Sequence, residues 1–270
     1  MSEIARPRSA LFLPASNPRA IEKARGLDCD MLLLDLEDAI RPEDKVRARE
    51  AAVAAAASDY GGRPVAIRLN GPGTPWHEAD IAAIRESRAS LAVLPKVESA
   101  DEAARVAAAL ARPVLAMIET PAGILAAPAI AATAGVVGLI PGTNDLAAAL
   151  RLPAGSNRAG LAFSLQAIIL AARAAGVMAL DGVWNQLDDP TGLEAECREG
   201  RAFGFDGKAL IHPGQIAIAN AIFAPDAAEI EEAQTLVAAA TGGAERFRGR
   251  MIEAMHVAAA RRLLAAVKAE

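Results

Sequence analysis

The chain has 270 residues, of which 53% are hydrophobic and only 3% aromatic, and its formal net charge is −5. This length suits one domain of the α/β-barrel size class or two small domains. The acidic balance excludes the basic surface of a nucleic-acid-binding protein. No uncharged apolar run approaches the ~20 residues of a membrane span, and the N-terminus lacks a signal-peptide pattern. We therefore expect a cytoplasmic protein that binds neither nucleic acid nor membrane. Cys29 and Cys197 are isolated, which argues against a disulfide framework or a zinc site.

Short apolar runs alternate along the chain with alanine-rich amphipathic segments. The runs lack strict polar alternation, which is typical of buried parallel strands. They predict eight strands, at Ala10–Pro14, Met31–Leu36, Val65–Leu69, Leu91–Pro95, Val114–Ile118, Val136–Pro141, Val177–Val183 and Phe205–Ile211. The segments between them have helical patterns, such as Glu43–Ala57, Asp101–Leu110 and Phe163–Ala175. Eight strands with intervening helices favour a (β/α)₈ barrel over an open doubly wound sheet, and the sequence contains neither a GxGxxG motif after the first strand nor a Walker loop.

The eight repeats end near Phe223, so we predict a catalytic barrel domain over residues 1–223. Residues 224–270 are expected to form a helical extension, with one helix over Pro225–Ala240 and a last helix over Met251–Lys268. The last helix is expected to carry an apolar stripe, which comprises Met251, Met255, Ala258 or Ala259, Leu263 and Val267. The stripe needs a surface to pack on, either the chain's own barrel or a neighbouring subunit.

Polar side chains gather at the predicted strand ends, where barrels of this kind place their catalytic groups. The strand starts carry nothing comparable. The set comprises Asp35, Glu37, Asp38, Arg68, Asn70, Lys96, Glu119, Asn144, Asp145, Asp181 and His212. Carboxylates beside a few cations predict a site that holds a divalent metal ion next to an anionic substrate.

Glu119 and Asp145 follow neighbouring strands, so their carboxylates can converge on Mg²⁺, with water and substrate oxygens as the other ligands. Arg68 can grip a substrate carboxylate with two hydrogen bonds. Such a site would chelate a 2-oxo acid and stabilise the enolate formed when a carbon–carbon bond breaks. The alternatives are that Glu119 or Asp145 caps a helix, and that Arg68 is an ordinary ion-pair partner.

Asp35, Glu37 and Asp38 lie within one turn, and we expect them to act on the metal through bound water. Lys96 and Lys208 are expected to neutralise this acidic cluster, with a catalytic Schiff base as the alternative. His212 is expected to cap a helix, and the chain contains no GxSxG motif of a serine hydrolase.

Seven motifs together resemble the HpcH/HpaI aldolase and citrate lyase β-subunit superfamily, especially its CitE-like members. They are RSALFLP at 8–14, LDLEDAI at 34–40, RLN at 68–70, LPKVES at 94–99, IET at 118–120, GTNDL at 142–146 and GFDGKALIHPGQ at 204–215. The resemblance implies a TIM barrel that uses Mg²⁺, or Mn²⁺ in its place. It also implies cleavage or formation of carbon–carbon bonds in citryl-CoA, malyl-CoA or related 3-hydroxyacyl-CoA thioesters, and a homo-oligomer, most often a trimer.

The same resemblance assigns roles to individual residues. It makes Glu119 and Asp145 the metal ligands, with Glu119 also at the substrate, and Arg68 the residue that grips the substrate. Arg19 and Lys23, after the first strand, could meet the phosphates of CoA.

Three positions depart from the family pattern. Asn144 stands where relatives often carry Glu. In the tail, Glu253 replaces an Asp that completes the site of a neighbouring subunit in many CoA lyases, and Met255 replaces the usual proline. Glu253 is therefore expected to act as a general acid or base in a neighbour's site, or else to be a solvated acid at a helix start.

The leading hypothesis is a carbon–carbon lyase that acts on a 3-hydroxyacyl-CoA and produces an oxo acid. A CoA thioesterase with the same metal site, a pyruvate-type aldolase on free oxo acids and a non-catalytic accessory subunit remain as alternatives.

Overall fold

The computed structural model describes residues 6–156 and 158–268. Its contacts divide the chain into two compact units, Met1–Phe223 and Ala224–Glu270.

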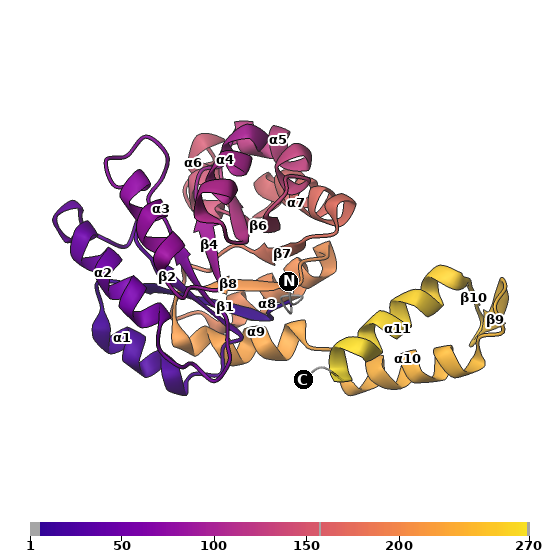
Figure 1. Cartoon of the computed structure of the whole chain (residues 1–270). Coiled ribbons are helices and arrows are strands. Elements are labelled where there is room, and N and C mark those ends of the chain that lie inside the picture. The colour runs from indigo at the N-terminus through magenta and orange to yellow at the C-terminus, as the bar shows by residue number, and fades with distance from the viewer. Residues whose placement is uncertain (1–5, 157, 269–270) are drawn as a thin grey trace. The chain divides into compact units, whose positions relative to one another are not determined.

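The first unit is a closed barrel of eight parallel strands, each hydrogen-bonded to the next, with the eighth pairing back to the first (Figure 1). The strands are β1 (Ser9–Pro14), β2 (Met31–Asp35), β3 (Val65–Arg68), β4 (Leu91–Leu94), β5 (Val114–Ile118), β6 (Val136–Pro141), β7 (Met178–Asp181) and β8 (Gly207–Leu210). All eight predicted strands are confirmed, with small shifts at their ends, and so is the (β/α)₈ fold class.

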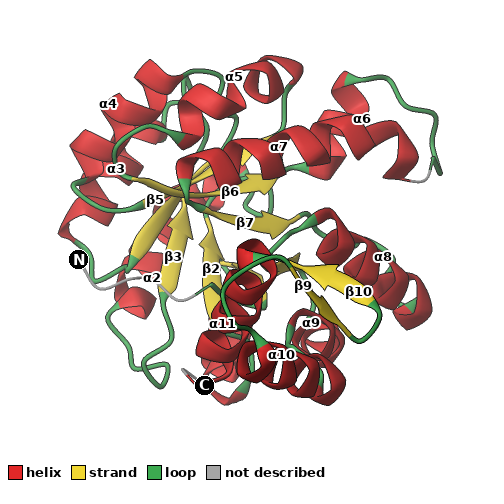
Figure 2. Ribbon diagram, turned by 90° about the vertical axis from the view of Figure 1, so that its right-hand side faces the viewer, coloured by secondary structure: helices red, strands yellow, loops and turns green. Residues whose placement is uncertain are grey.

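Helices follow the strands and surround them, as Figure 2 shows. They are α1 (Pro18–Lys23), α2 (Lys45–Ala56), α3 (His77–Glu86), α4 (Ala100–Leu110), α5 (Pro121–Ala131), α6 (Thr143–Ala149), α7 (Ala162–Ala175), α8 (Pro190–Phe203) and α9 (Ile216–Phe223). Short 3₁₀ turns, labelled η, lie at η1 (Ala24–Gly26), η2 (Pro42–Asp44), η3 (Arg158–Leu161) and η4 (Pro213–Gln215).

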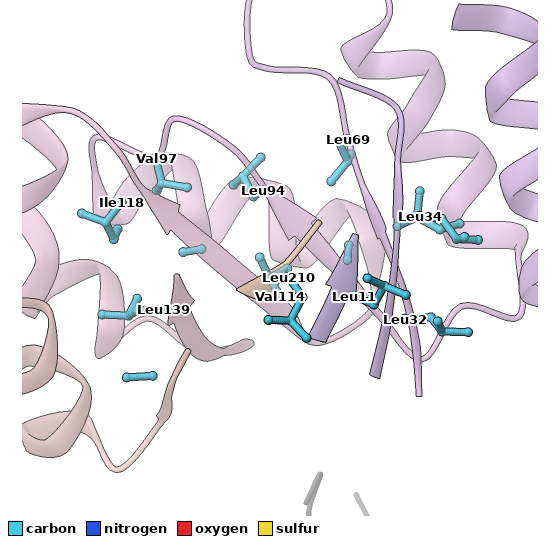
Figure 3. Close-up of a cluster of buried hydrophobic side chains, with 14 of the residues drawn as sticks. Leu11, Leu32, Leu34, Leu69, Leu94, Val97, Val114, Ile118, Leu139 and Leu210 are labelled. Carbon is cyan, nitrogen blue, oxygen red and sulfur yellow. The ribbon is translucent and has the colours of Figure 1, made fainter. Parts of the chain in front are cut away.

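Alternate residues of each strand face opposite sides of the barrel wall, and both sides are apolar. The inward side chains fill the barrel and form one cluster with Phe12, Leu33, Met117 and Leu180 among its members. The outward side chains pack against the helices in a larger cluster (Figure 3). Because the direction alternates strictly, the position of a polar residue in its strand decides whether it faces the barrel axis or the helix layer.

One helical stretch, Arg158–Ala175, is long and apolar enough by length and composition to cross a membrane. It comprises η3 and α7 of the barrel. Its buried residues, such as Leu165 and Ile168, belong to the cluster between the strands and the helices.

The second unit consists of α10 (Ala227–Ala239), β9 (Glu245–Phe247), β10 (Arg250–Ile252) and α11 (Ala254–Lys268). The two helices lie side by side, and β9 and β10 form an antiparallel hairpin (Figure 1). A small core joins the four elements, with Ala233, Leu236, Phe247, Ile252 and Ala260 buried in it.

The prediction of a single last helix over Met251–Lys268 is wrong at its start. Arg248 and Gly249 both have positive φ angles, 45° and 84°. Two such residues form the tight turn of a two-residue hairpin, so Met251 lies in β10 and the helix begins at Ala254. The predicted stripe is only partly correct, because Met251 and Met255 are exposed.

Candidate active site

A cavity of about 360 Å³ opens at the C-terminal ends of the strands. Charged, amide and apolar side chains line it together. They include Phe12, Asp35, Asp38, Arg68, Met117, Glu119, Asn144, Asp145, Val183 and Asn185. The structure therefore brings the acidic run, Arg68, Glu119 and Asp145 to one place, as the sequence predicted.

Arg68 and Asp35 are direct neighbours across β2 and β3, where the strand register pairs them. Arg68 Nε and Nη2 donate to the two oxygens of Asp35 at 2.6 and 2.7 Å. The remaining nitrogen, Nη1, lies 3.1 Å from Glu37 Oε2 and 3.4 Å from Asp38 Oδ2. The pKa of Arg68 is raised by these carboxylates against the opposing effect of burial. The two-pronged face of Arg68 thus holds Asp35, and only Nη1 is left to meet a substrate.

Glu37 is fixed from two directions. Lys96 Nζ donates to Glu37 Oε1 at 3.1 Å, and the buried Lys45 donates to the backbone oxygens of Leu36 and Glu37 at 2.8 and 2.7 Å. Among the described side chains, Glu37 Oε2 is one of the buried atoms without a hydrogen-bond donor. Burial raises the pKa of Glu37 above its ordinary value, and the charge of Arg68 opposes that rise.

Glu119 is the most enclosed of the predicted metal ligands, with a relative exposure of 1%. Its Oε1 accepts a hydrogen bond of 2.7 Å from the backbone N–H of Lys96, whose φ of 54° is unusual for a residue with a side chain. Gly142 makes room for the carboxylate, because a Cβ there would lie 2.1 Å from Glu119 Oε2. Burial, followed by the negative charge of Glu37, raises the pKa of Glu119 to about 7.

Neither predicted metal ligand caps a helix. Thr120 caps α5 by accepting from the N–H of Gly123. Gly142 is the N-cap of α6, and Asp145 is the third residue of that helix. Both carboxylates instead adjoin the cavity, and the charge of Asp145 contributes to the raised pKa of Glu119.

These two carboxylates suit a hard divalent cation. Their mutual repulsion is relieved when a cation lies between them, and carboxylate oxygens are the ligands that Mg²⁺ takes in proteins. Within residues 6–156 and 158–268, no group of three or more His, Cys, Asp or Glu side chains is arranged to hold a metal ion. A cation here would therefore complete its coordination with water and substrate oxygens.

Two of the predicted residues do not join this site. Asp181 and Lys208 point outward into the helix layer, where Lys208 Nζ bonds to Asp181, the carbonyl of Gly182 and Glu196. The prediction that Lys208 neutralises the acidic cluster is therefore wrong, whereas Lys96 does contact Glu37. His212 caps η4 by accepting from the N–H of Gly214, as expected.

The sequence did not single out Asn185 or Lys45. Asn185 follows β7 and lines the cavity, and its amide bonds to that of Asn144. Its place just after a predicted strand end was the available signal. Lys45 opens α2 and acts through backbone oxygens, which leaves no pattern in the sequence.

The remaining predicted residues lie outside the cavity lining. Arg19 and Lys23 are exposed on α1, the helix that follows β1. Glu253 lies in the second unit between β10 and α11, and its backbone N–H donates to His256 Nδ1 at 2.9 Å.

Comparison with known proteins agrees with this architecture. Residues 8–213 match the family described as HpcH/HpaI aldolase/citrate lyase. The (3S)-malyl-CoA thioesterase of Cereibacter sphaeroides is 42% identical over 270 residues, which covers 97% of this chain and 95% of the relative. The citrate lyase subunit beta of Leuconostoc mesenteroides is 31% identical, with 95% and 92% covered. CitE from Mycobacterium tuberculosis, solved with magnesium, acetoacetate and coenzyme A, matches with a TM-score of 0.86 at 32% identity, over 98% of each chain.

Proposed function

Since the chain belongs to the HpcH/HpaI aldolase/citrate lyase family, we propose that it is a Mg²⁺-dependent carbon–carbon lyase. Its substrate would be a 3-hydroxyacyl-CoA such as citryl-CoA or malyl-CoA, and one product an oxo acid. The observation that carries this proposal is the pair Glu119 and Asp145 at a cavity that also contains Arg68. The complex of the Mycobacterium tuberculosis relative with magnesium, an oxo acid and coenzyme A supports it.

Glu119 and Asp145 would hold the cation, and Mn²⁺ could replace Mg²⁺ because both take oxygen ligands. The bound cation supplies Lewis-acid polarisation of a substrate oxygen. Asp35, Glu37 and Asp38 would act through water around it, and Lys96 would keep Glu119 and Glu37 in place.

Arg68 would orient the carboxylate of the oxo-acid part through Nη1. Asp35 fixes the other face of the guanidinium, so the position of Nη1 is set before substrate arrives. The weakest partner of Nη1 is Asp38, whose side chain is 56% exposed. A substrate carboxylate could therefore take the place of Asp38 at little cost, because exposed ion pairs contribute little.

In the direction of cleavage, the 3-hydroxyl group of the thioester loses its proton and the bond between C2 and C3 breaks. The electron pair of that bond passes toward the thioester carbonyl, and C2 then takes up a proton. The products are an oxo acid and a shortened acyl-CoA. We assign both proton transfers to Glu253 of a neighbouring subunit, which would accept the hydroxyl proton as a base and return it to C2 as an acid.

A homo-oligomer, in particular a homotrimer in the cytoplasm, fits this assignment. Large apolar side chains are exposed on the barrel at Leu125, Phe163 and Leu170, and on the second unit at Met251 and Met255. An interface at these side chains would remove their apolar surface from water. Arg19 and Lys23, which lie on α1, would contact the phosphates of CoA.

Sharing of sites between subunits can be tested by mixing two inactive variants, Glu253→Gln and Glu119→Ala. If sites are shared, mixed oligomers recover activity, because one barrel combines an intact metal site with an intact tail. No recovery despite demonstrated subunit exchange would reject the shared site and leave Glu253 as a solvated acid at the start of α11.

A CoA thioesterase is the second candidate, because the relative at 42% identity is named (3S)-malyl-CoA thioesterase. The same metal site would then direct water at the thioester carbonyl. The decisive experiment incubates the pure protein and Mg²⁺ with a panel of 3-hydroxyacyl-CoA esters and, separately, with free oxo acids. It measures oxo acid, acyl-CoA and free CoA.

Oxo acid together with acyl-CoA supports the lyase. Free CoA together with an intact hydroxy acid supports the thioesterase. Turnover of free oxo acids alone would indicate a pyruvate-type aldolase, and no turnover of any compound would indicate an accessory subunit.

A further inference from the structure

A second cavity, of about 780 Å³, adjoins the candidate metal site on the side of β6 and β7. Four residues line both cavities and therefore form the wall between them: Thr143, Asn144, Val183 and Asn185. Two of the four come from the start of α6, and two follow the end of β7.

One part of this wall is closed by backbone packing. Gly182 lies so close to α6 that a Cβ there would sit 2.6 Å from Thr143 Cγ2 and 3.1 Å from the backbone oxygen of Pro141. The ends of β6 and β7 thus meet at a contact that leaves no space for a ligand.

The other part is formed by the exposed amides of Asn144 and Asn185, together with Val183. Asn185 Nδ2 donates to Asn144 Oδ1 at 2.6 Å, and Asn144 Nδ2 lies 3.4 Å from Asn185 Oδ1. The pair joins the helix that carries Asp145 to the loop after β7. It is the part of the wall that side-chain truncation can remove without disturbing buried packing.

The larger cavity has both polar and apolar lining, and its acidic residues, Glu196 and Glu199, disfavour an anion. Ala147, Leu152, Leu161 and Trp184 line it. Its cation, Arg158, already lies 2.6 Å from Asp181 and 3.3 Å from Glu199. A group that entered this space from the metal site would therefore be neutral and apolar.

We propose that the Asn144–Asn185 amide pair limits the size of the substituent on the oxo-acid part of the substrate. It does so by closing the metal site off from the larger cavity beside it. This inference rests on the proposed function, because it assumes that a 2-oxo acid binds at Glu119, Asp145 and Arg68.

The test measures calorimetric affinity, with Mg²⁺ present, for unbranched 2-oxo acids from pyruvate to 2-oxohexanoate. The proteins are the wild type, Asn185→Ala, Asn144→Ala and a matched control, Gln186→Ala. Gln186 neighbours Asn185 and lines only the larger cavity. Mg²⁺ affinity and the melting temperature of each variant are measured alongside.

In wild type and the control, affinity should not rise with chain length. In Asn185→Ala it should rise by about fourfold for each added methylene that enters the larger cavity. Asn144→Ala should show the same rise, since either truncation opens the wall. Tryptophan emission should shift with the long acids in the opened variants, because Trp184 lines the space they would enter.

Binding of 2-oxo acids with the same chain-length profile in all four proteins overturns this inference alone. Failure of all four proteins to bind any 2-oxo acid with Mg²⁺ overturns the proposed function, and this inference with it.

Discussion

Two acid–base pairs each join adjacent strands of the barrel, but their side chains face different surroundings. Asp35 and Arg68 face each other across β2 and β3, and Asp181 and Lys208 face each other across β7 and β8. Asp35, Arg68 and Asp181 are the last residues of their strands, whereas Lys208 is the second residue of β8. Both pairs are buried. The first pair points into the cavity at the barrel mouth, and the second points outward to α8, where Gly200 makes room for Asp181.

The outward pair is saturated with partners. Lys208 is 0% exposed, and its ammonium group has three acceptors, which use all three of its donors. At the mouth, carboxylates outnumber the cations that face them, and Glu37 and Glu119 both have raised pKa values. The contrast teaches that burial of charge does not itself mark a site, whereas an excess of acceptors beside a cavity does.

The largest effect is expected from substitution of the carboxylates at the barrel mouth. Glu119→Gln or Asp145→Asn should abolish Mg²⁺ binding in calorimetry and lower turnover by at least about a hundredfold. The barrel should remain folded, because loss of one carboxylate relieves repulsion in the cluster. Glu98→Gln, which changes an exposed acid near Lys96, is the control and should bind Mg²⁺ normally. Undiminished Mg²⁺ affinity in both ligand variants would reject the assignment.

Substitutions in the Asp181–Lys208 cluster should instead lower stability. Lys208→Met leaves Asp181 buried without its ammonium partner, so the free energy of unfolding in urea should fall by about 3–5 kcal/mol. The milder Glu196→Gln keeps Asp181 paired with Lys208 and should cost about 1.5–3 kcal/mol. Lys96→Met, which changes the partly exposed lysine of the mouth, should change stability much less. Equal losses at Lys208 and Lys96 would remove the distinction between the two clusters.

The strands and much of the candidate site could be predicted from the sequence. Buried parallel strands are continuous apolar runs, and the carboxyl ends of such strands meet at one face of a barrel. That reasoning brought Glu119, Asp145, Arg68 and the run at Asp35 to one cavity. The exposure and hydrogen-bond partners of these residues could not be predicted from the sequence. For example, the two hydrogen bonds from the Arg68 guanidinium to Asp35 depend on the register of two strands.

Strand-end position alone was not enough for Asp181, and the expectation that Lys208 neutralises the acidic cluster was wrong as well. Leu180 and Ala209 face the barrel interior, so the residues next to them in the strands must face outward. A strict count of alternate positions would have separated them from the site. The hairpin before α11 was missed for a local reason. Arg248 and Gly249 both adopt positive φ angles, but only one of them is a glycine, so the sequence gives a weak turn signal.

A smaller effect is expected from Arg68→Lys, which keeps the charge at the mouth but removes the planar fork. A lysine cannot hold both oxygens of Asp35 and present another nitrogen to a substrate. The affinity for an oxo acid should fall about 10- to 100-fold, whereas the affinity for Mg²⁺ should change little. Saturation kinetics measure the first quantity and calorimetry the second. Wild-type kinetics in Arg68→Lys would show that Arg68 does not orient the substrate.

The smallest and most graded effect concerns pH. The pKa of Glu119 is raised to about 7 from an ordinary value of 4.5, so the metal-free protein holds a proton there that Mg²⁺ must displace. Mg²⁺ affinity should therefore fall as pH drops below about 7, by up to about tenfold per pH unit for one competing proton. Calorimetry from about pH 5.5 to 8, a range that spans this change, measures it. A Mg²⁺ affinity that does not change over that range would contradict the raised pKa.

The same proton also affects the stability of the metal-free protein. This contribution to the free energy of unfolding depends on pH in the opposite sense from that of a salt-bridged acid. The folded state binds this proton up to about pH 7, while the unfolded chain loses it near the ordinary value of 4.5. The stability it contributes is therefore fully present below 4.5 and is lost as pH rises through 7. Glu119→Gln carries no such proton, so its stability relative to wild type, without Mg²⁺, should increase across this interval. If the free energies of unfolding of Glu119→Gln and wild type differ by the same amount at both ends of the interval, Glu119 does not titrate there. The carboxylates at the barrel mouth would then not lack compensating positive charge.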